Sequence, residues 1–339
     1  MKSLTLVVDM KGCPNRCKHC WLGHFNNTPM EDNADEFLVA YFKNYFENIT
    51  FYSWLREPDY TKAYVKRWNK DNEISINVKP QRFELASFYK LNRDKNYVKF
   101  LKDVGVKVVQ LTFFGLEEMT DKYVGRKGAF KELVNATNIL IENGIAPRYQ
   151  AFLNAENKED VVKLLQFIDE LKLYKRCENI GVPFKFFVHE GSCDGENRKL
   201  YNIRINKEDI PKELIPYHLD YDQLLTEKEC CEILVNDNSS YVPHNSDQIV
   251  LNITSNYDVY YNFTHISPNW KIGNIKNDVK EELIRKIINE DTFALNKARN
   301  ISLRELVLKY GDKSSNKIFY LDDYKLYLLN RYIDSESDE

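Results

Sequence analysis

The sequence predicts an α/β protein in which strands and helices alternate along the chain. Three observations predict it: short apolar runs rich in β-branched residues, longer segments between them with apolar residues spaced three or four apart, and Gly, Pro or Asn at the joints. Such alternation places parallel strands in a sheet with helices outside it. The expected strands are residues 4–10, 49–54, 73–78, 106–114, 146–153 and 183–188.

Each of the first five strands is followed by a segment with helical periodicity. In the first of these, aromatic residues such as Phe37, Tyr41 and Tyr45 recur on one face of a helix. Gly105 and Gly144 stand where two helices should end, as glycine commonly does. The expected helices are residues 31–48, 59–69, 94–104, 128–142 and 157–172.

Composition and charge exclude several classes of protein. The chain has 339 residues, of which 43 % are apolar, 29 % charged and 13 % aromatic, as in a globular protein with a well-filled core. The formal charge of −3 argues against binding to nucleic acid or an anionic membrane. We find no run of about 18 apolar residues and no signal peptide, so we expect a cytoplasmic protein without a membrane anchor.

The cysteines are unevenly placed, and their grouping is the strongest functional signal. Residues 4–10 read as a strand, and Gly12, Pro14 and Asn15 break it into a loop that carries three thiols. In a reducing compartment such thiols indicate metal or redox chemistry before disulfides. The seven cysteines are Cys13, Cys17, Cys20, Cys177, Cys193, Cys230 and Cys231.

The spacing Cys-x3-Cys-x2-Cys suits a four-iron cluster that is held by only three thiolates. Cys13, Cys17 and Cys20 would each bind one iron, and the fourth iron would stay open to a substrate or cofactor. Two alternatives remain. A structural zinc could use the three cysteines with His24, although no second Cys-x2-Cys pair exists, or the three cysteines could be unrelated buried residues.

With this motif the chain resembles the radical S-adenosylmethionine (SAM) superfamily. The resemblance implies a [4Fe-4S] cluster on Cys13, Cys17 and Cys20, with SAM on the open iron. Reductive cleavage of SAM would then give a 5′-deoxyadenosyl radical that removes a substrate hydrogen. It also implies a partial (β/α)6 TIM-like barrel with its active site at the C-terminal ends of the strands. An electron donor such as flavodoxin or ferredoxin would reduce the cluster.

Two further motifs resemble the superfamily near the cluster. His19 occupies the position before the third cysteine, where an aromatic residue contacts adenine. Glu57, at the end of the second strand, matches the acidic residue that binds the SAM amino group. Leu55 and Arg56 stand where the superfamily has two glycines. The alternative for Glu57 is a solvated loop carboxylate.

The fourth and fifth strands supply the remaining candidates for SAM binding. Thr112 matches a strand serine and Arg126 a downstream arginine of radical SAM peptide-modifying enzymes. Gln150, midway along the fifth strand, is the candidate for the SAM ribose or carboxylate. An ordinary strand threonine and a surface arginine are the alternatives for the first two.

The C-terminal third is expected to form an α+β cap. We divide the chain into a barrel (1–200), a linker (201–245) and an extension (246–339). The extension has a hairpin signal around 255–258 and a helix near 279–290, which resembles a SPASM or twitch extension, but it contains no cysteine. An auxiliary cluster from the four remaining cysteines stays open. The other expectations are helices at 280–298, 301–310 and 321–332 and a solvated acidic tail at 334–339.

The resemblance favours an enzyme that modifies a ribosomally made peptide, by epimerisation or cross-linking. The alternative is an enzyme that acts on a small metabolite such as a sugar or amino-acid derivative. A non-catalytic regulator would leave the SAM-binding candidates without a role. Cys193 lies in a Gly-rich loop after the sixth strand, and we interpret it as a hydrogen-atom donor to a substrate radical, against the alternative of a packed core cysteine.

Overall fold

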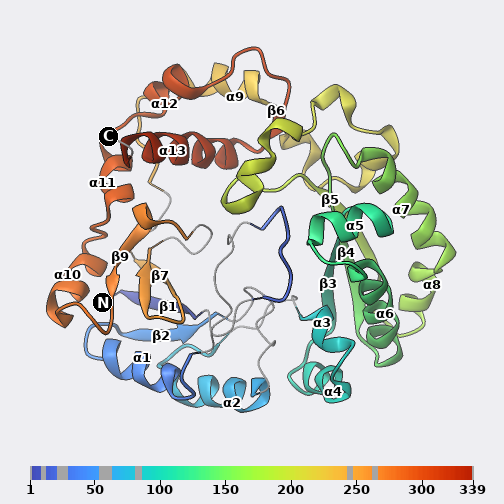
Figure 1. Cartoon of the computed structure of the whole chain (residues 1–339), viewed down its shortest axis with the longest axis horizontal. Helices are drawn as coiled ribbons and strands as arrows, with labels where there is room; N and C mark the ends of the chain where they lie inside the picture. The colour runs from blue at the N-terminus through green and yellow to red at the C-terminus, as the bar shows by residue number, and fades with distance from the viewer. Residues whose placement is uncertain are drawn as a thin grey trace.

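The computed structural model describes residues 2–8, 13–20, 30–52, 63–80, 86–242, 247–261 and 266–337. It confirms a mixed α/β architecture with parallel sheets. The two larger sheets lie on opposite sides of the molecule, with the segment of residues 13–20 between them (Figure 1).

The strands form three sheets within the described residues. One sheet has the order β2-β1-β7-β8-β9, a second has the order β3-β4-β5, and β6 pairs with β10. The strands are β1 (Ser3–Val8), β2 (Asn48–Phe51), β3 (Val108–Phe113), β4 (Ala146–Phe152), β5 (Lys185–His189), β6 (Leu225–Thr226), β7 (Gln248–Ile253), β8 (Asp258–Tyr260), β9 (Lys271–Asn274) and β10 (Ile318–Phe319).

The helices cover the outer faces of these sheets, as Figure 1 shows for α6 and α7 beside β3, β4 and β5. The helices are α1 (Ala34–Phe42), α2 (Tyr64–Ile74), α3 (Phe88–Leu91), α4 (Lys95–Asp103), α5 (Glu117–Val124), α6 (Ala129–Glu142), α7 (Lys158–Glu170), α8 (Leu173–Glu178), α9 (Glu227–Leu234), α10 (Lys280–Ile288), α11 (Phe293–Arg299), α12 (Leu303–Tyr310) and α13 (Leu321–Ser337). Short 3-10 helices are η1 (Gly195–Ile203), η2 (Lys207–Asp209), η3 (Lys212–Tyr217), η4 (Tyr221–Gln223) and η5 (Pro268–Trp270).

The expected third strand, 73–78, is wrong. Helix α2 continues to Ile74, and only Ile76 pairs with β2, in an isolated antiparallel bridge to Ile49. Asn77 then adopts a positive φ of 60°, which a strand cannot continue through. The expected strands 106–114, 146–153 and 183–188 correspond to β3, β4 and β5. Helix α5, which the sequence did not reveal, follows β3 directly.

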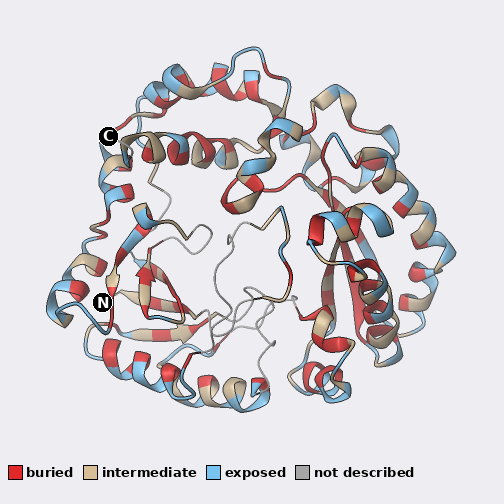
Figure 2. Cartoon of the chain, in the orientation of Figure 1, coloured by how far each residue is buried: buried red, intermediate tan, exposed pale blue. Residues whose placement is uncertain are grey.

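The sheet of β3, β4 and β5 has one apolar and one partly polar face. Along β3, Val109, Leu111 and Phe113 are buried, whereas the alternate residues Gln110 and Thr112 are half-buried. Successive side chains of a strand point to opposite faces of the sheet. The apolar residues therefore face the helices, and the polar residues face the interior of the molecule, toward the other large sheet. Burial accordingly concentrates on the strands and on the helix surfaces turned toward them (Figure 2).

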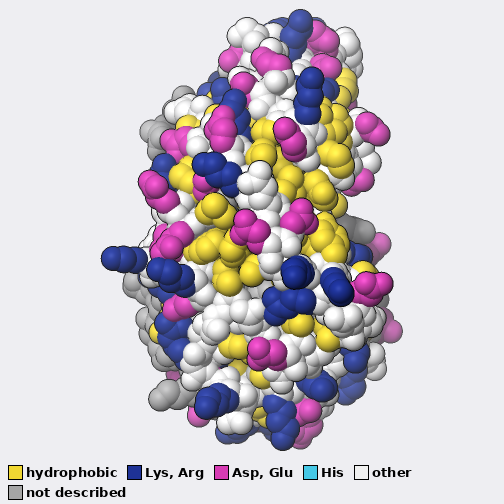
Figure 3. Space-filling view, turned by 90° about the vertical axis from the view of Figure 1, so that its right-hand side faces the viewer, with side chains coloured by type: hydrophobic (Ala, Val, Ile, Leu, Met, Phe, Trp, Pro, Cys, Tyr) yellow, Lys and Arg dark blue, Asp and Glu magenta, His cyan; other side chains and the backbone are white. Residues whose placement is uncertain are grey.

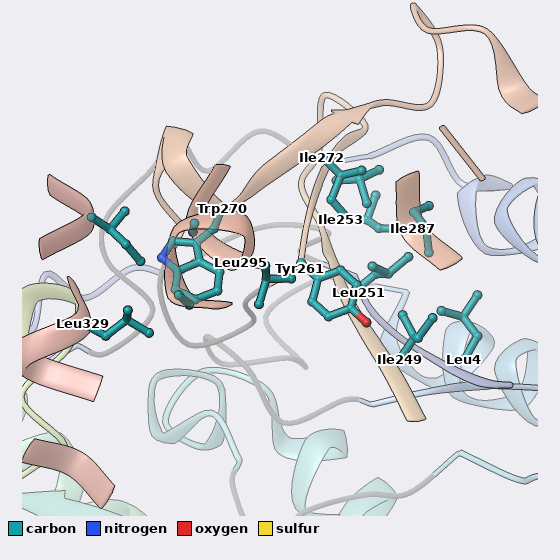
Figure 4. Close-up of a cluster of buried hydrophobic side chains, with 14 of the residues drawn as sticks. Leu4, Ile249, Leu251, Ile253, Tyr261, Trp270, Ile272, Ile287, Leu295 and Leu329 are labelled. Carbon is teal, nitrogen blue, oxygen red and sulfur yellow. The ribbon is translucent and has the colours of Figure 1, made fainter. Parts of the chain in front are cut away.

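The C-terminal segment contributes a strand to the sheet that contains the N-terminal strand. β7 pairs in parallel with β1, with Leu6 in register with Leu251. Behind this sheet, Leu251, Trp270 and residues of the C-terminal helices form one buried cluster (Figure 4). β1, α1 and β2 therefore share one core with residues 246–339, while the domain boundaries themselves remain a prediction.

Two expectations about the C-terminal third need correction. The segment expected as a linker contains α9, which begins with a capping box between Thr226 and Glu229. The acidic tail is not simply solvated, because α13 extends to Ser337. Asp334 pairs with Arg198 at 2.7 Å and Glu336 pairs with Lys297 at 2.5 Å. The expected hairpin is confirmed by the antiparallel pairing of β7 with β8.

The surface shows no bias toward one charge on the face drawn in Figure 3. Lysine, arginine, aspartate and glutamate side chains are interspersed there around a band of hydrophobic side chains. This mixture agrees with the near-balanced composition of the chain. Among the described residues, no helix is both long and apolar enough to cross a membrane.

A buried polar seam joins the end of β5 to the C-terminal part of the chain. The side chains of Glu190 and His218 have no exposed surface, and Glu190 Oε2 lies 3.6 Å from His218 Nε2. Arg204 crosses the seam and donates hydrogen bonds to the carbonyls of Ile318 and Gly191. Burial raises the pKa of Glu190 to about 7 and lowers the pKa of His218 to about 4, so His218 is neutral at pH 7.

The shared core predicts that Leu251→Ala destabilises the whole chain. Leu251 has no exposed surface, and removing a buried leucine side chain costs about 2–5 kcal/mol of unfolding free energy. In urea denaturation, the free energy of unfolding should fall equally whether unfolding is followed in the N-terminal or in the C-terminal segment. Leu308→Ala, at a leucine that is 57 % exposed, is the control and should change little. A loss confined to the C-terminal segment would contradict one common core.

The seam predicts a pH-dependent effect of Glu190→Gln on stability. Folding raises the pKa of Glu190 from 4.5 to about 7, so the folded state binds the proton more tightly. The carboxyl group therefore destabilises the wild type increasingly from about pH 4.5 to about pH 7 and constantly above that. At about 1.4 kcal/mol per pKa unit, the variant should gain up to about 3 kcal/mol over wild type between pH 5 and pH 8.

Urea unfolding at pH 5 and pH 8 measures this difference. Glu178→Gln, at an exposed position of α8, is the control and should track the wild type at both values. A difference between Glu190→Gln and wild type that does not change with pH would contradict the assignment.

Candidate active site

The cysteine loop, residues 13–20, is attached to the C-terminal end of α5. Arg16 N donates to the carbonyl of Val124 at 3.0 Å, and Lys18 N donates to the carbonyl of Tyr123 at 2.8 Å. The last carbonyls of a helix have no partner within the helix, so they are available to accept from another segment. These two bonds fix the backbone between the cysteines.

Gly125 makes this close approach possible. Its φ of +72° is in the left-handed region, and a Cβ at this position would lie 2.6 Å from the carbonyl oxygen of Arg16. Any other residue would push the loop away from α5. The sequence shows Gly125 directly before Arg126, but without the fold nothing connects this glycine with residues more than a hundred positions earlier.

His19 packs among aromatic side chains at the C-terminal ends of β3 and β4. Its ring centroid lies 4.7 Å from that of Phe114 and 4.2 Å from that of Phe152. Phe114 in turn stacks on Tyr123 of α5. The prediction that the loop lies at the C-terminal edge of the sheet is thereby confirmed. A small pocket adjoins His19, and the described residues that line it are His19, Phe114, Phe152, Leu153, Asn154, Glu190, Asn197, Leu200 and Arg204.

Arg126 also contacts the cysteine loop. Its Nε donates to Asn15 Oδ1 at 2.9 Å, and its guanidinium group pairs with Glu132 at 2.7 Å. Burial alone would raise the pKa of Glu132, but hydrogen bonds from Arg93 and Arg126 hold this pKa below its usual range. Arg126 is therefore a fixed positive charge beside the loop. The sequence had not indicated Asn15 or Glu132 as its partners.

The Gly-rich loop after β5 reaches the cysteine loop, as expected. Glu196 N donates to the carbonyl of Cys20 at 2.7 Å. Within this loop Cys193 is only 1 % exposed and has a φ of 59°, an uncommon conformation for a residue with a side chain. Burial raises the pKa of its thiol to about 11. Cys193 thus keeps its S–H at neutral pH and packs within the core described for β1 and β7.

Thr112 and Gln150 lie side by side on β3 and β4, as in-register partners. They belong to the face of the sheet that also carries Phe152, on which His19 packs. Gln150 Oε1 accepts a hydrogen bond from Gln110 Nε2, and Gln110 Oε1 accepts one from Arg148 at 2.6 Å. Thr112 and Gln150 therefore lie on the sheet face against which His19 of the cysteine loop packs, closer to the N-terminal ends of β3 and β4 than His19 is.

Two candidates lie outside the described residues. Glu57, the expected partner of the SAM amino group, falls in the segment 53–62 with Leu55 and Arg56. His24, the fourth ligand of the alternative zinc site, falls in 21–29. Both assignments stay predictions.

The four other cysteines do not come together in one place. Cys177 lies in the core between the sheet of β3, β4 and β5 and its helices, whereas Cys193, Cys230 and Cys231 lie in the core behind β1 and β7. Burial raises the pKa of all four, to about 12 for Cys230, which opposes the thiolate form that binds metal. An auxiliary cluster held by all four is therefore not supported.

The cysteine loop, by contrast, fits a cluster with three protein ligands. Cys13, Cys17 and Cys20 are thiols on one anchored loop, and all three are only half-buried. Within the described part of the chain, no three His, Cys, Asp or Glu side chains converge as they would around a single metal ion. A cubane needs no such convergence, because each thiolate binds a different iron.

Comparisons with known proteins agree with this geometry. Residues 7–168 match the family model of the Radical SAM superfamily. A curated relative, Fe-coproporphyrin III synthase of Methanosarcina barkeri (strain Fusaro / DSM 804), is 26 % identical over 152 residues, which are 44 % of this chain and 35 % of the relative. The chain thus spans about a third of the length of the relative that it matches.

Similar solved structures extend the likeness of the fold to nearly the whole chain. The structure of native anSMEcpe with bound AdoMet superposes with a TM-score of 0.55 and 16 % identity, covering 99 % of each chain. Streptococcus suis SuiB bound to its precursor peptide SuiA has a TM-score of 0.45 and 13 % identity, covering 86 % of this chain and 66 % of SuiB. The segment that matches the Radical SAM superfamily, residues 7–168, contains the anchored cysteine loop, and the cofactors of that superfamily are a [4Fe-4S] cluster and S-adenosylmethionine.

Proposed function

We propose that the chain is a radical SAM enzyme that modifies a ribosomally made peptide. The observation that carries the first part is the Cys-x3-Cys-x2-Cys loop, which is anchored at the C-terminal ends of β3 and β4 and touched by the loop after β5. Cys13, Cys17 and Cys20 would hold the cluster there, and with SAM it would supply a 5′-deoxyadenosyl radical that could remove a hydrogen atom from the substrate. A flavodoxin or ferredoxin is the proposed electron donor, in the cytoplasm.

In this proposal Cys13, Cys17 and Cys20 hold the cluster, and five residues hold SAM. His19 lies against the adenine, and Glu57 accepts from the amino group in a charge-assisted bond. Arg126 and Thr112 are assigned to SAM on the resemblance, and Gln150 to its ribose or carboxylate. Arg126 has a second role, because its bond to Asn15 keeps the loop in place.

Support for a peptide substrate comes from the fold. Native anSMEcpe with bound AdoMet and Kp18Cys peptide superposes on this chain with a TM-score of 0.54, over 99 % of this chain. A fold of this kind therefore accommodates a peptide beside SAM. We propose epimerisation or cross-linking as the reaction.

A small metabolite is the second candidate substrate. The observation that favours it is the match to Fe-coproporphyrin III synthase, which extends over 152 residues of this chain. Liquid chromatography and mass spectrometry distinguish the two candidates. The reconstituted protein is incubated without oxygen with SAM, dithionite and either the short peptides encoded beside its gene or a panel of sugars and amino-acid derivatives. A mass or stereochemical change in a peptide supports the first candidate.

Cys193 is the proposed hydrogen-atom donor in an epimerisation. Its raised pKa keeps the S–H bond that such a donor needs. The thiol would give its hydrogen atom to the substrate carbon radical; one electron from the electron donor and one proton from solvent would then convert the thiyl radical back to the thiol.

The cluster assignment predicts that Cys13, Cys17 and Cys20 together hold one four-iron cluster. Reconstituted wild type should contain about four irons per chain, since only these thiols share a loop. Replacing all three by Ala should abolish iron binding and the formation of 5′-deoxyadenosine from SAM. The control replaces Cys177, Cys230 and Cys231 by Ala and should keep the iron content. A zinc-loaded wild type or an iron-loaded triple variant would overturn the assignment.

The donor assignment predicts that Cys193→Ala still forms 5′-deoxyadenosine with substrate but yields no inverted product. In deuterated water the wild-type product should carry one solvent deuteron, because the thiol hydrogen exchanges with solvent. Cys177→Ala, which removes an equally buried thiol from the other core, is the control and should give normal product. Normal product from Cys193→Ala would show that this cysteine only packs.

A further inference from the structure

The cofactor assignment gives no role to the outer edge of β5, although Gln150, which lines the adjoining pocket, is assigned to SAM. β5 is the last strand of its sheet, and its outer edge pairs with other described backbone only at Val188, which bridges to His218. A pocket runs along the rest of this edge. The described residues that line it are Gln110, Arg148, Gln150, Tyr174, Phe184, Lys185, Phe186, Phe187, His189 and Leu219.

Four consecutive residues of the strand region, 184–187, line this one pocket. Side chains of successive strand residues point to opposite faces of a sheet. A pocket lying on one face would therefore be lined by every second residue. This pocket instead has lining residues from both faces of the sheet, so it wraps around the edge of the strand.

The direction of the backbone groups along β5 follows from two hydrogen bonds. His189 O accepts from Leu153 N, on the side of β4, whereas Val188 O accepts from Leu219 N at 3.5 Å, on the outer side. Backbone groups of a strand alternate between its two sides. The N–H and C=O of Phe186, two residues before Val188, therefore point outward into the pocket.

The side chains around this edge are unusually apolar for a surface. Tyr174 is 47 % exposed and Leu219 is 45 % exposed, and they flank the edge. Tyr174 packs edge-on against Phe184 at 5.1 Å between ring centroids, which holds it beside the strand. A strand edge whose backbone is only partly paired is a template for another strand, and proteins usually blunt such an edge.

The charged side chains at this edge favour a binding partner that carries negative charge. Lys185 is exposed on the edge strand and forms no ion pair among the described residues. The described lining of the pocket contains no aspartate or glutamate. Lys185 is in register with Arg148 of β4, so the two side chains lie on the same face of the sheet.

We propose that the edge of β5 binds an extended acidic peptide segment as an added strand. Main-chain hydrogen bonds to Phe186 would supply affinity, the aromatic flanks would accept alternate side chains, and an acidic residue would pair with Lys185. The inference rests on the peptide branch of the proposed function and gives the substrate a docking site apart from the cysteine loop.

The test uses the reconstituted full-length chain and the capped peptide Thr-Val-Glu-Val-Thr as a probe. Binding is followed by fluorescence anisotropy of the labelled peptide, and hydrogen–deuterium exchange is followed at the amide of Phe186. We expect saturable binding and slower exchange at Phe186. Methylation of the peptide nitrogens should abolish both, because it removes the main-chain donors.

A charge exchange tests the role of Lys185. Replacing the glutamate of the probe by lysine should weaken binding to wild type by about fivefold, as expected for one exposed ion pair. Lys185→Glu should reverse this preference. Lys175→Glu, at an exposed position of the neighbouring helix α8, is the matched control and should keep the wild-type preference.

Three outcomes would overturn the proposal: no saturable binding of either peptide, equal preference in wild type and Lys185→Glu, or unchanged exchange at Phe186 on binding. These measurements need no turnover. A failure here would leave peptide modification untouched as an activity, and a failure of peptide modification would be seen in the mass-spectrometric assay instead.

Discussion

The candidate site depends on the two backbone hydrogen bonds between the cysteine loop and the end of α5. Each such bond contributes about 1 kcal/mol net, whereas ordering one residue costs about 1–2 kcal/mol. Two bonds alone cannot hold a loop of this length. The packing of His19 against Phe114 and Phe152 and the bond between Arg126 and Asn15 supply the remainder. The three thiols are positioned by these contacts together.

The strand that leads into the loop is itself held from both sides. β1 lies between β2 and β7, so the C-terminal segment supports the N-terminal strand through a full row of parallel pairing. Trp270 and Leu295, both without exposed surface, fill the core behind that sheet. The strand that precedes the cluster loop is thus held by residues near the opposite end of the chain.

The seven cysteines form two groups that differ in how deeply their thiols are buried. Cys177, Cys193, Cys230 and Cys231 lie in apolar cores, and burial holds their pKa values above the usual range. They remain thiols that pack, or in the proposal for Cys193 give a hydrogen atom. Cys13, Cys17 and Cys20 lie on a half-buried loop, with Arg126 tied to the same loop through Asn15.

The sequence by itself determined the local features of this protein. The cysteine spacing predicted the cluster loop, and periodicity predicted β3, β4, β5 and the helices α4, α6 and α7, because these patterns depend on near neighbours. The segment 73–78 failed because its apolar run was too short to distinguish a strand from the end of α2. Only the tertiary structure decided that β7 joins β1, that Gly125 seats Arg16, that Glu190 meets His218, and that β5 ends its sheet. Each of these contacts joins residues far apart in the chain, and no local pattern encodes which distant partner a buried face or a strand edge will meet.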